Sequence, residues 1–184
     1  MKLNFGSAHD NLGEDWKNVD ALDWEGNTDI LHDMTKFPYP FENESIDEIR
    51  SVENLEHISW RLTDSVLKEW NRILKLNGKL HIQVPDAGKC MEYYVKRQIC
   101  ECVPHKADRG GFFADPDCVR CSGLAKINPQ RWLLTFLGAQ KHPYDAHLSI
   151  FTENMLKKKL AVAGFKNISF KFDLYKLKVN CEKV

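Results

Sequence analysis

The sequence predicts an α/β fold with a mostly parallel sheet. Short apolar or alternating segments, typical of strands, recur through the first 85 residues. A segment with helical spacing separates the last two of them, and strands that alternate with helices or loops favour parallel pairing. The alternating tail of the chain has no further crossover helix, so it predicts an antiparallel edge strand or hairpin.

Five strands are expected in the first half of the chain. The first is a short apolar run that ends at Gly6, and the fourth alternates apolar with polar residues. The fifth follows the turn-forming pair Asn77-Gly78. The expected strands are residues 3–5, 16–20, 28–33, 45–52 and 79–85.

Helices are expected after the fourth strand and near the end of the chain. Thr63 is typical of an N-cap, and Asn77-Gly78 is typical of a left-handed C-terminal cap. Between them lie apolar residues at helical spacing, namely Val66, Leu67, Trp70, Ile73 and Leu74. A second helix is expected from Thr152 to Gly164, and another near 88–102. The tail 168–179 alternates as one or two strands.

Composition indicates a globular chain. It has 184 residues, of which 43% are hydrophobic and 28% charged, enough for one domain with a real core. No apolar run approaches the roughly 20 residues that span a bilayer, and no signal-peptide pattern opens the chain. We therefore expect a cytoplasmic protein without a membrane partner. The balance of 26 basic and 26 acidic side chains argues against a nucleic-acid partner, and the run Lys157–Lys159 fits a solvated helix face.

Acidic residues follow two of the expected strands. In doubly wound sheets, ligands bind beyond the carboxyl ends of the strands. Asp20 ends the second strand, where an ionised carboxylate can accept two hydrogen bonds from a ribose diol. Asp33 ends the third, where it can accept the amine of adenine, and Gly6 permits close approach of the backbone. Each residue alone is more often a turn residue or helix cap, but the three in register predict a nucleotide-like ligand.

Several long runs resemble class I S-adenosylmethionine-dependent methyltransferases, in particular small predicted members whose chain starts at the first strand. The resemblance covers about residues 1–86 and 147–170. Its runs are KLNFGSA, WKNVD, DILHDMTKFPYPFENESIDEIRSVENLEHI, LKEWNRILKLNGKLHIQVPD and HLSIFTENMLKKKLAVAGFKNI. The most specific match is to the family pattern FPFP, SFDEI, LEHI and LKPGGKL followed by VPD.

The resemblance implies a Rossmann-like methyltransferase sheet in a single domain, residues 1–184, with S-adenosylmethionine as cofactor. A cysteine-containing insertion at about 87–146 would cap the substrate side. The reaction would be methyl transfer to a small-molecule or sugar-like acceptor. The resemblance places cofactor contacts at Gly6, Ser7, Ala8, Asp20, Asp33, Met34, Ser51, Val52 and Glu53. His57 matches the family's LEH, where helix-start packing is the alternative to chemistry.

Two features depart from the family. Ala8 stands where the family usually has a glycine, which adds a Cβ near the cofactor and disfavours positive φ. The first helix is also curtailed, since residues 9–13 have the composition of a turn. A shorter helix contributes less dipole to holding a carboxylate, so weaker cofactor binding is expected.

A general base is required only if the acceptor is protonated. The run KHPYDAH offers His142, Asp145 and His147 for that role, against the alternative of a loop with surface histidines. Asp86, after a strand-end proline, is a second candidate base, against the alternative of a turn residue.

Four cysteines lie in two close pairs, Cys100-x-Cys102 and Cys118-x-x-Cys121. In a reducing compartment such pairs suit a structural zinc ion, with His105 as a substitute ligand, and unligated thiols are the alternative. Cys90 and Cys181 have the setting of ordinary cysteines.

Two other function classes stay open from the sequence. One is a non-catalytic relative that binds the cofactor as a sensor or scaffold. The other is a zinc-stabilised interaction module. The sequence predicts no oligomeric state.

Overall fold

The computed structural model describes residues 1–95, 136–141, 143–173 and 176–184. The chain divides into two compact units. The first comprises Met1–Asp86 with Leu148–Val184, and the second comprises Ala87–His147. The single-domain organisation with a cap over the substrate side stays a prediction.

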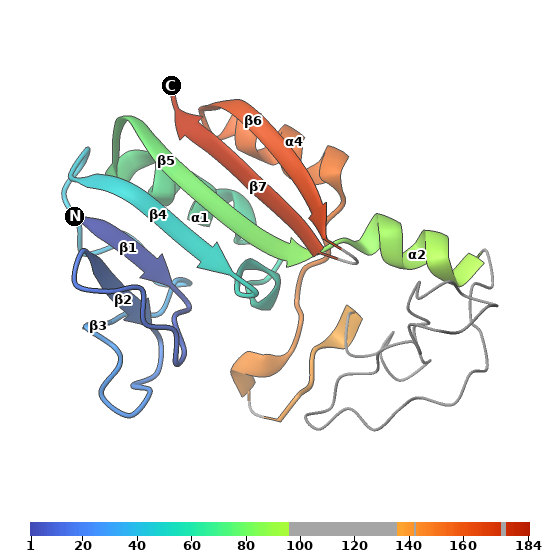
Figure 1. The fold of residues 1–184 in the computed structure, drawn as a ribbon, viewed down its shortest axis with the longest axis horizontal. Coiled ribbons are helices and arrows are strands. Elements are labelled where there is room, and N and C mark those ends of the chain that lie inside the picture. The colour runs from blue at the N-terminus through green and yellow to red at the C-terminus, as the bar shows by residue number, and fades with distance from the viewer. Residues whose placement is uncertain (96–135, 142, 174–175) are drawn as a thin grey trace. The chain divides into compact units, whose positions relative to one another are not determined.

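The first unit is built on a seven-stranded sheet with the order β3-β2-β1-β4-β5-β7-β6 (Figure 1). The pairings among β1 to β5 are parallel, and β7 is antiparallel to both β5 and β6. The mostly parallel sheet with an antiparallel C-terminal hairpin is therefore confirmed. The strands are β1 (Lys2–Phe5), β2 (Trp16–Asp20), β3 (Ile30–Leu31), β4 (Ile46–Val52), β5 (Leu74–Pro85), β6 (Phe165–Asp173) and β7 (Lys176–Lys183).

The helix after β4 is shorter than expected. A 3₁₀ turn, η1 (Leu55–His57), comes first, and α1 spans Thr63–Ile73 with Leu62, not Thr63, at the N-cap position. The chain becomes extended at Leu74, so β5 begins there and Asn77, with φ of 59°, lies inside the strand. The β4–β5 register shifts between Ile46 and Glu48. Asn77-Gly78 therefore lies in a bulge of β5. The left-handed backbone at Asn77 accommodates the residues that β5 has in excess of β4 over this stretch.

The other helices agree more closely with the sequence pattern. Thr152 caps α4 (Glu153–Val162) by accepting a hydrogen bond from Met155 N at 3.3 Å, and Gly164 follows with φ of 91°. In the second unit, α2 covers Ala87–Val95 and the 3₁₀ turn η2 covers Pro143–Asp145. Among the residues described, no helix is both long and apolar enough to cross a membrane.

One face of the sheet carries the hydrophobic core. In Figure 1, α1 and α4 lie on the same side of the sheet, behind it. The fully buried Phe5 of β1 lies 5.7 Å from Trp70 of α1 and 5.6 Å from Tyr39, measured between ring centroids. Leu156 and Leu160 bring the buried side of α4 into the same cluster. The expected helical spacing in α1 therefore marks the residues that cover the sheet.

The opposite face carries a polar row across neighbouring strands. Strand pairing aligns Asn18, Asn4, Arg50, His81 and Asn180 from β2 through β1, β4 and β5 to β7. Asn4 Nδ2 donates to Asn18 Oδ1 at 3.0 Å, and Arg50 Nη1 donates to Asn4 Oδ1 at 2.8 Å. His81 is hydrogen-bonded to Asn180. The described side chains on this face thus satisfy one another by hydrogen bonds across neighbouring strands.

Trp70→Ala tests the core. Truncating a fully buried tryptophan leaves a cavity beside Phe5, so the free energy of unfolding should fall by about 3–5 kcal/mol. Urea denaturation measures this. Trp60→Ala is the matched control, because Trp60 is 63% exposed and its replacement should cost under about 1 kcal/mol. Equal losses in the two variants would contradict the packing described.

Candidate functional site

The carboxyl ends of three parallel strands form one line. Phe5 of β1 is in register with Val19 of β2 and with Ser51 of β4. Gly6, Asp20 and Val52 are the next positions along, so they share one edge of the sheet (Figure 1). The nine predicted cofactor positions all belong to the first unit.

The turn after β1 requires a glycine. Gly6 has φ of 66° and donates its N–H to Val19 O at 2.9 Å. A Cβ at this position would lie 2.2 Å from Cγ of Asn54, so no side chain fits. The next residue, Ser7, is buried, and its Oγ has no hydrogen-bond partner among the described residues. Ala8 adopts φ of 43°, a left-handed conformation that costs an L-residue about 1–2 kcal/mol.

Asp20 joins the ends of β1 and β2. One carboxylate oxygen accepts the N–H of Ala8 at 3.1 Å, and the other accepts the N–H of Leu22 at 3.1 Å. A carboxylate offers about four acceptor positions, so capacity for two further hydrogen bonds is left. Asp20 therefore both fixes the turn and can accept a vicinal diol.

Asp33 and Met34 follow β3, which is shorter than the expected 28–33. Asp33 Oδ1 accepts from both N and Oγ1 of Thr35, each at 2.8 Å, as a turn-capping residue does. Its Oδ2 accepts no hydrogen bond from a described residue. Met34 is buried, and its carbonyl accepts from the Tyr39 hydroxyl at 3.0 Å. Asp33 thus keeps one oxygen for a ligand while holding its own turn.

The end of β4 is polar and closely held. Ser51 is fully buried, and Glu53 has φ of 50°. Glu53 Oε1 accepts from Gln83 Nε2 at 2.9 Å and pairs with Lys176 at 3.6 Å. Val52 lies between Ser51 and Glu53 in the chain and is half-buried. The cofactor role of these three positions stays a prediction.

Asn54 is a site residue that the sequence reasoning missed. Its Nδ2 donates to Ser51 Oγ at 3.2 Å and lies 3.6 Å from the Met34 sulfur, while its side chain covers Gly6. It therefore connects the ends of β1 and β4 with the segment after β3. Its position directly after the expected strand 45–52 was the available signal.

Glu56 was missed as well. It lies in η1, is 1% exposed, and neither carboxyl oxygen has a hydrogen-bond partner among the described residues. Burial, and next the negative charge of Glu53, raise the pKa of Glu56 well above the ordinary value. The backbone of Glu56, then Lys176 and the backbone of Asn54, act in the opposite direction with less effect. The Glu56 carboxyl is therefore protonated more readily than that of an ordinary glutamate.

Of the predicted general bases, Asp145 and His147 belong to the second unit and Asp86 to the first. Asp145 Oδ2 accepts from Lys141 N at 3.2 Å, and His147 N donates to Leu137 O at 3.1 Å. His142 lies outside the described residues. Asp86 is buried after β5 and forms a β-bridge with Phe151. The catalytic roles of all four stay predictions.

The predicted zinc ligands, Cys100, Cys102, Cys118 and Cys121, also lie outside the described residues, as does His105. The zinc ion and the interaction module built on it therefore stay predictions. Cys90 and Cys181 are both buried, as expected of ordinary cysteines. Burial raises the pKa of the Cys181 thiol to about 12, so it is inert at neutral pH.

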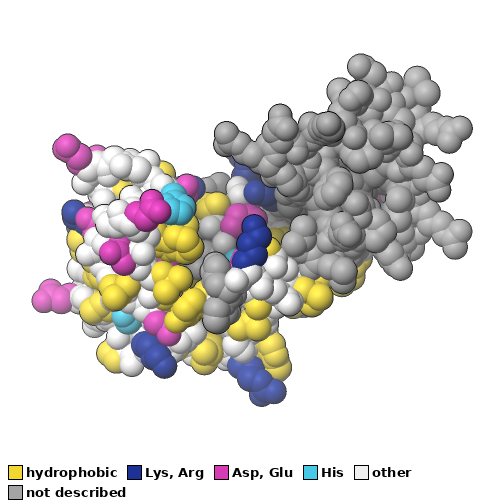
Figure 2. Space-filling model, turned by 90° about the horizontal axis from the view of Figure 1, so that it is seen from below, with side chains coloured by type: hydrophobic (Ala, Val, Ile, Leu, Met, Phe, Trp, Pro, Cys, Tyr) yellow, Lys and Arg dark blue, Asp and Glu magenta, His cyan; other side chains and the backbone are white. Residues whose placement is uncertain are grey.

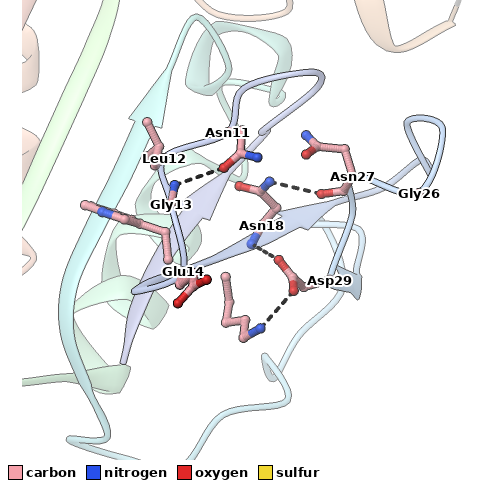
Figure 3. A pocket seen from close by; sticks show the side chains of 10 residues that line it. Asn11, Leu12, Gly13, Glu14, Asn18, Gly26, Asn27 and Asp29 are labelled. Carbon is pink, nitrogen blue, oxygen red and sulfur yellow. Dashed lines mark hydrogen bonds and ion pairs between the residues drawn. The ribbon is translucent and has the colours of Figure 1, made fainter.

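A polar pocket of about 460 Å³ lies beside β2 (Figure 3). The turn at 11–14 and the loop at 26–29 enclose it, and no helix forms at 9–13, which confirms the expected curtailment. Its polar groups bind one another: Asp29 accepts from Asn18 N at 2.8 Å and from Lys17 Nζ at 2.9 Å.

Charges are interspersed on the face drawn in Figure 2. Its coloured residues show basic side chains standing apart from one another among acidic and hydrophobic ones. The absence of a nucleic-acid partner stays a prediction.

No family model matches the sequence, and no curated protein matches it. Solved structures do match its fold. They include the 1,6-didemethyltoxoflavin-N1-methyltransferase of Burkholderia thailandensis, seen with 1,6-didemethyltoxoflavin and S-adenosylhomocysteine (TM-score 0.54, 13% identity, 100% of this chain and 71% of that one). A second is a methyltransferase of Thermotoga maritima, a possible histamine N-methyltransferase (TM-score 0.57, 13% identity, 100% of this chain and 82% of that one). A third is a methyltransferase of Archaeoglobus fulgidus (TM-score 0.60, 11% identity, 99% of this chain and 85% of that one). The chain therefore has the fold of S-adenosylmethionine-dependent methyltransferases, as the sequence resemblance predicts.

Glu56→Gln tests the buried carboxyl through the pH dependence of stability. A raised pKa means that the folded state binds more protons than the unfolded state above about pH 4.5. Stability is therefore lost as pH rises through the folded pKa, by up to about 1.4 kcal/mol per pH unit. Urea denaturation from about pH 4.5 to about pH 8 should show the variant gaining stability relative to wild type. Glu42→Gln, at an exposed carboxyl, should leave the dependence of stability on pH unchanged. If stability depended on pH in the same way in Glu56→Gln and wild type, the raised pKa of Glu56 would be refuted.

Ala8→Gly tests the strained turn. Because Ala8 is left-handed, glycine should raise the free energy of unfolding by about 0.5–1 kcal/mol. Ala163→Gly is the control, since Ala163 has φ of −77° and glycine there should lower stability by a similar amount. Urea denaturation of both variants measures the difference. A loss of stability in both would mean that the turn is unstrained.

Proposed function

We propose that the chain transfers a methyl group from S-adenosylmethionine to a small-molecule acceptor, with the cofactor bound at the carboxyl edge of β1, β2, β3 and β4. The observation that carries this proposal is the 3.1 Å hydrogen bond between Ala8 N and Asp20 Oδ2. It brings the glycine turn and the strand-end acid, which are far apart in the sequence, into one site.

The residues present fit the cofactor. Asp20 keeps acceptor capacity for the ribose hydroxyls, and Asp33 Oδ2 is available to the adenine amine. Ser7 Oγ, buried without a partner among the described residues, is an orphan polar atom at the turn that would face the methionine part. Buried polar groups are normally satisfied, so an orphan here supports a ligand. When bound, S-adenosylmethionine supplies an electrophilic methyl group on a sulfonium.

The chain's own contribution is mainly positioning. Asp20, Asp33 and the backbone at Gly6 would fix one reactant, and orientation alone can supply a large part of the acceleration of a displacement. Two structures of similar fold belong to proteins named for methylating small nitrogen compounds, which supports a small-molecule acceptor. The sugar-like acceptor remains the alternative from the sequence.

A second candidate is a relative that binds the cofactor without turnover. The side chain of Asn54 against Gly6 and the left-handed Ala8 favour it, because both crowd or strain the turn. Binding of S-adenosylmethionine without methyl transfer to any of a broad panel of small acceptors would favour this candidate.

Asp20→Asn tests the cofactor site. The amide offers one acceptor oxygen where the carboxylate offers two, so the affinity for S-adenosylmethionine should fall by about tenfold or more. Isothermal titration calorimetry measures this. Asp173→Asn removes the same charge at an exposed hairpin end and should leave the affinity unchanged. Undetectable binding to the wild-type chain at millimolar cofactor would overturn the proposed function itself.

A further inference from the structure

We propose that Glu56 is the acid–base residue for the methyl acceptor, and that the acceptor is a small amine. This inference rests on the proposed methyl transfer. It assigns a role to a side chain that the sequence analysis did not consider, and it names the class of substrate.

The position of Glu56 is the first argument. It follows Asn54 by two residues, and Asn54 touches Gly6, Ser51 and Met34 of the candidate cofactor site. The carbonyl of Glu56 accepts the N–H groups of Leu148 at 2.8 Å and Ser149 at 3.0 Å. These bonds fix the backbone of η1 beyond the carboxyl end of β4. The backbone of Glu56 is thus fixed at the carboxyl edge of the sheet, two residues beyond Asn54 of the candidate cofactor site.

The unmet hydrogen-bonding capacity is the second argument. Both oxygens of Glu56 lack a partner among the described residues although the side chain is 1% exposed. An unsatisfied buried carboxyl costs stability, so its retention needs an explanation outside the fold. A donor group of a ligand would supply the missing partner.

The surrounding charge is the third argument, and it selects a cation. Glu53, from the end of β4, acts on Glu56 with a like charge, and Lys176 of β7 opposes it while pairing with Glu53. A ring nitrogen of His57, in the same 3₁₀ turn, lies within 4.8 Å of a Glu56 oxygen. The negative charge of Glu53, and that of Glu56 once its proton has left, would favour an ammonium ligand and disfavour a carboxylate.

The proton balance of the reaction suits this residue. Binding of R–NH₃⁺ displaces the resting proton of Glu56 to solvent, and the resulting carboxylate takes one proton from the ammonium to give R–NH₂ and a neutral carboxyl. The nitrogen lone pair then forms the new C–N bond, the C–S bond breaks, and its electron pair stays on sulfur. The products are a methylated ammonium and a neutral thioether, and Glu56 is left in its neutral resting form. The raised pKa of the Glu56 carboxyl strengthens it as a proton acceptor.

The experiment uses the full chain and three probes of equal size, namely n-butylammonium, n-butanol and butyrate. Infrared difference spectra report the C=O stretch of a protonated carboxyl. Butylammonium should remove that band from the wild-type protein, whereas butanol and butyrate should leave it. In calorimetry, Glu56→Gln should weaken butylammonium binding by about tenfold, and Glu42→Gln should not change it.

Two results would overturn the inference. One is a band that persists in saturating butylammonium, which would make Glu56 a structural, permanently protonated carboxyl. The other is tighter binding of butanol or butyrate than of butylammonium, which would favour a sugar-like or anionic acceptor. S-adenosylmethionine is titrated separately into wild type and Glu56→Gln. If neither protein bound S-adenosylmethionine, the proposed methyl transfer would be overturned. If both bound it equally and only Glu56→Gln lost the effect of butylammonium, the change would be specific to Glu56.

Discussion

The packing of Phe5 fixes both the core and the candidate site. Its ring contacts Trp70 of α1 and Tyr39 on the core side of the sheet, and the next residue is the left-handed Gly6. Tyr39 in turn holds the Met34 carbonyl through its hydroxyl, and its N–H donates to Glu69 of α1 at 2.8 Å. Burying one aromatic side chain therefore sets where β1 ends and where the segment after β3 lies. The cofactor edge depends on that burial.

The two faces of the sheet are stabilised in different ways. Helices α1 and α4 pack on the apolar face, and on the other face Asn18, Asn4 and Arg50 satisfy one another across three strands. Arg50 also reaches Asp10 at 3.0 Å, which ties the turn after β1 to the polar row. The irregular turn at 7–13 and the polar row are thus linked by hydrogen bonds.

The sequence predicted the strands and their mostly parallel pairing well, because alternation of apolar and polar residues and strand-end acids are local signals. It misplaced the end of α1, because Asn77-Gly78 suits a helix cap and a strand bulge equally and only the pairing of β4 with β5 decides. It found Asp20, whose role follows from a strand end, but missed Asn54 and Glu56. Their importance comes from contacts between distant segments, such as Asn54 with Gly6, and from burial that no local pattern encodes.

Residues 1–60 are acidic, with 14 Asp and Glu against 4 Lys and Arg, and several of these acids lie at strand ends. Four acidic residues end a parallel strand or follow one, namely Asp20, Asp33, Glu53 and Glu56. Among these four, the described contacts pair only Glu53 with a lysine. In the proposed reaction the donor carries a sulfonium and the acceptor an ammonium, so both reactants are cations that repel each other. An acidic edge lowers the cost of bringing them together. The buried Glu56 goes further, because accepting a proton removes the acceptor's charge at the moment when the two must meet.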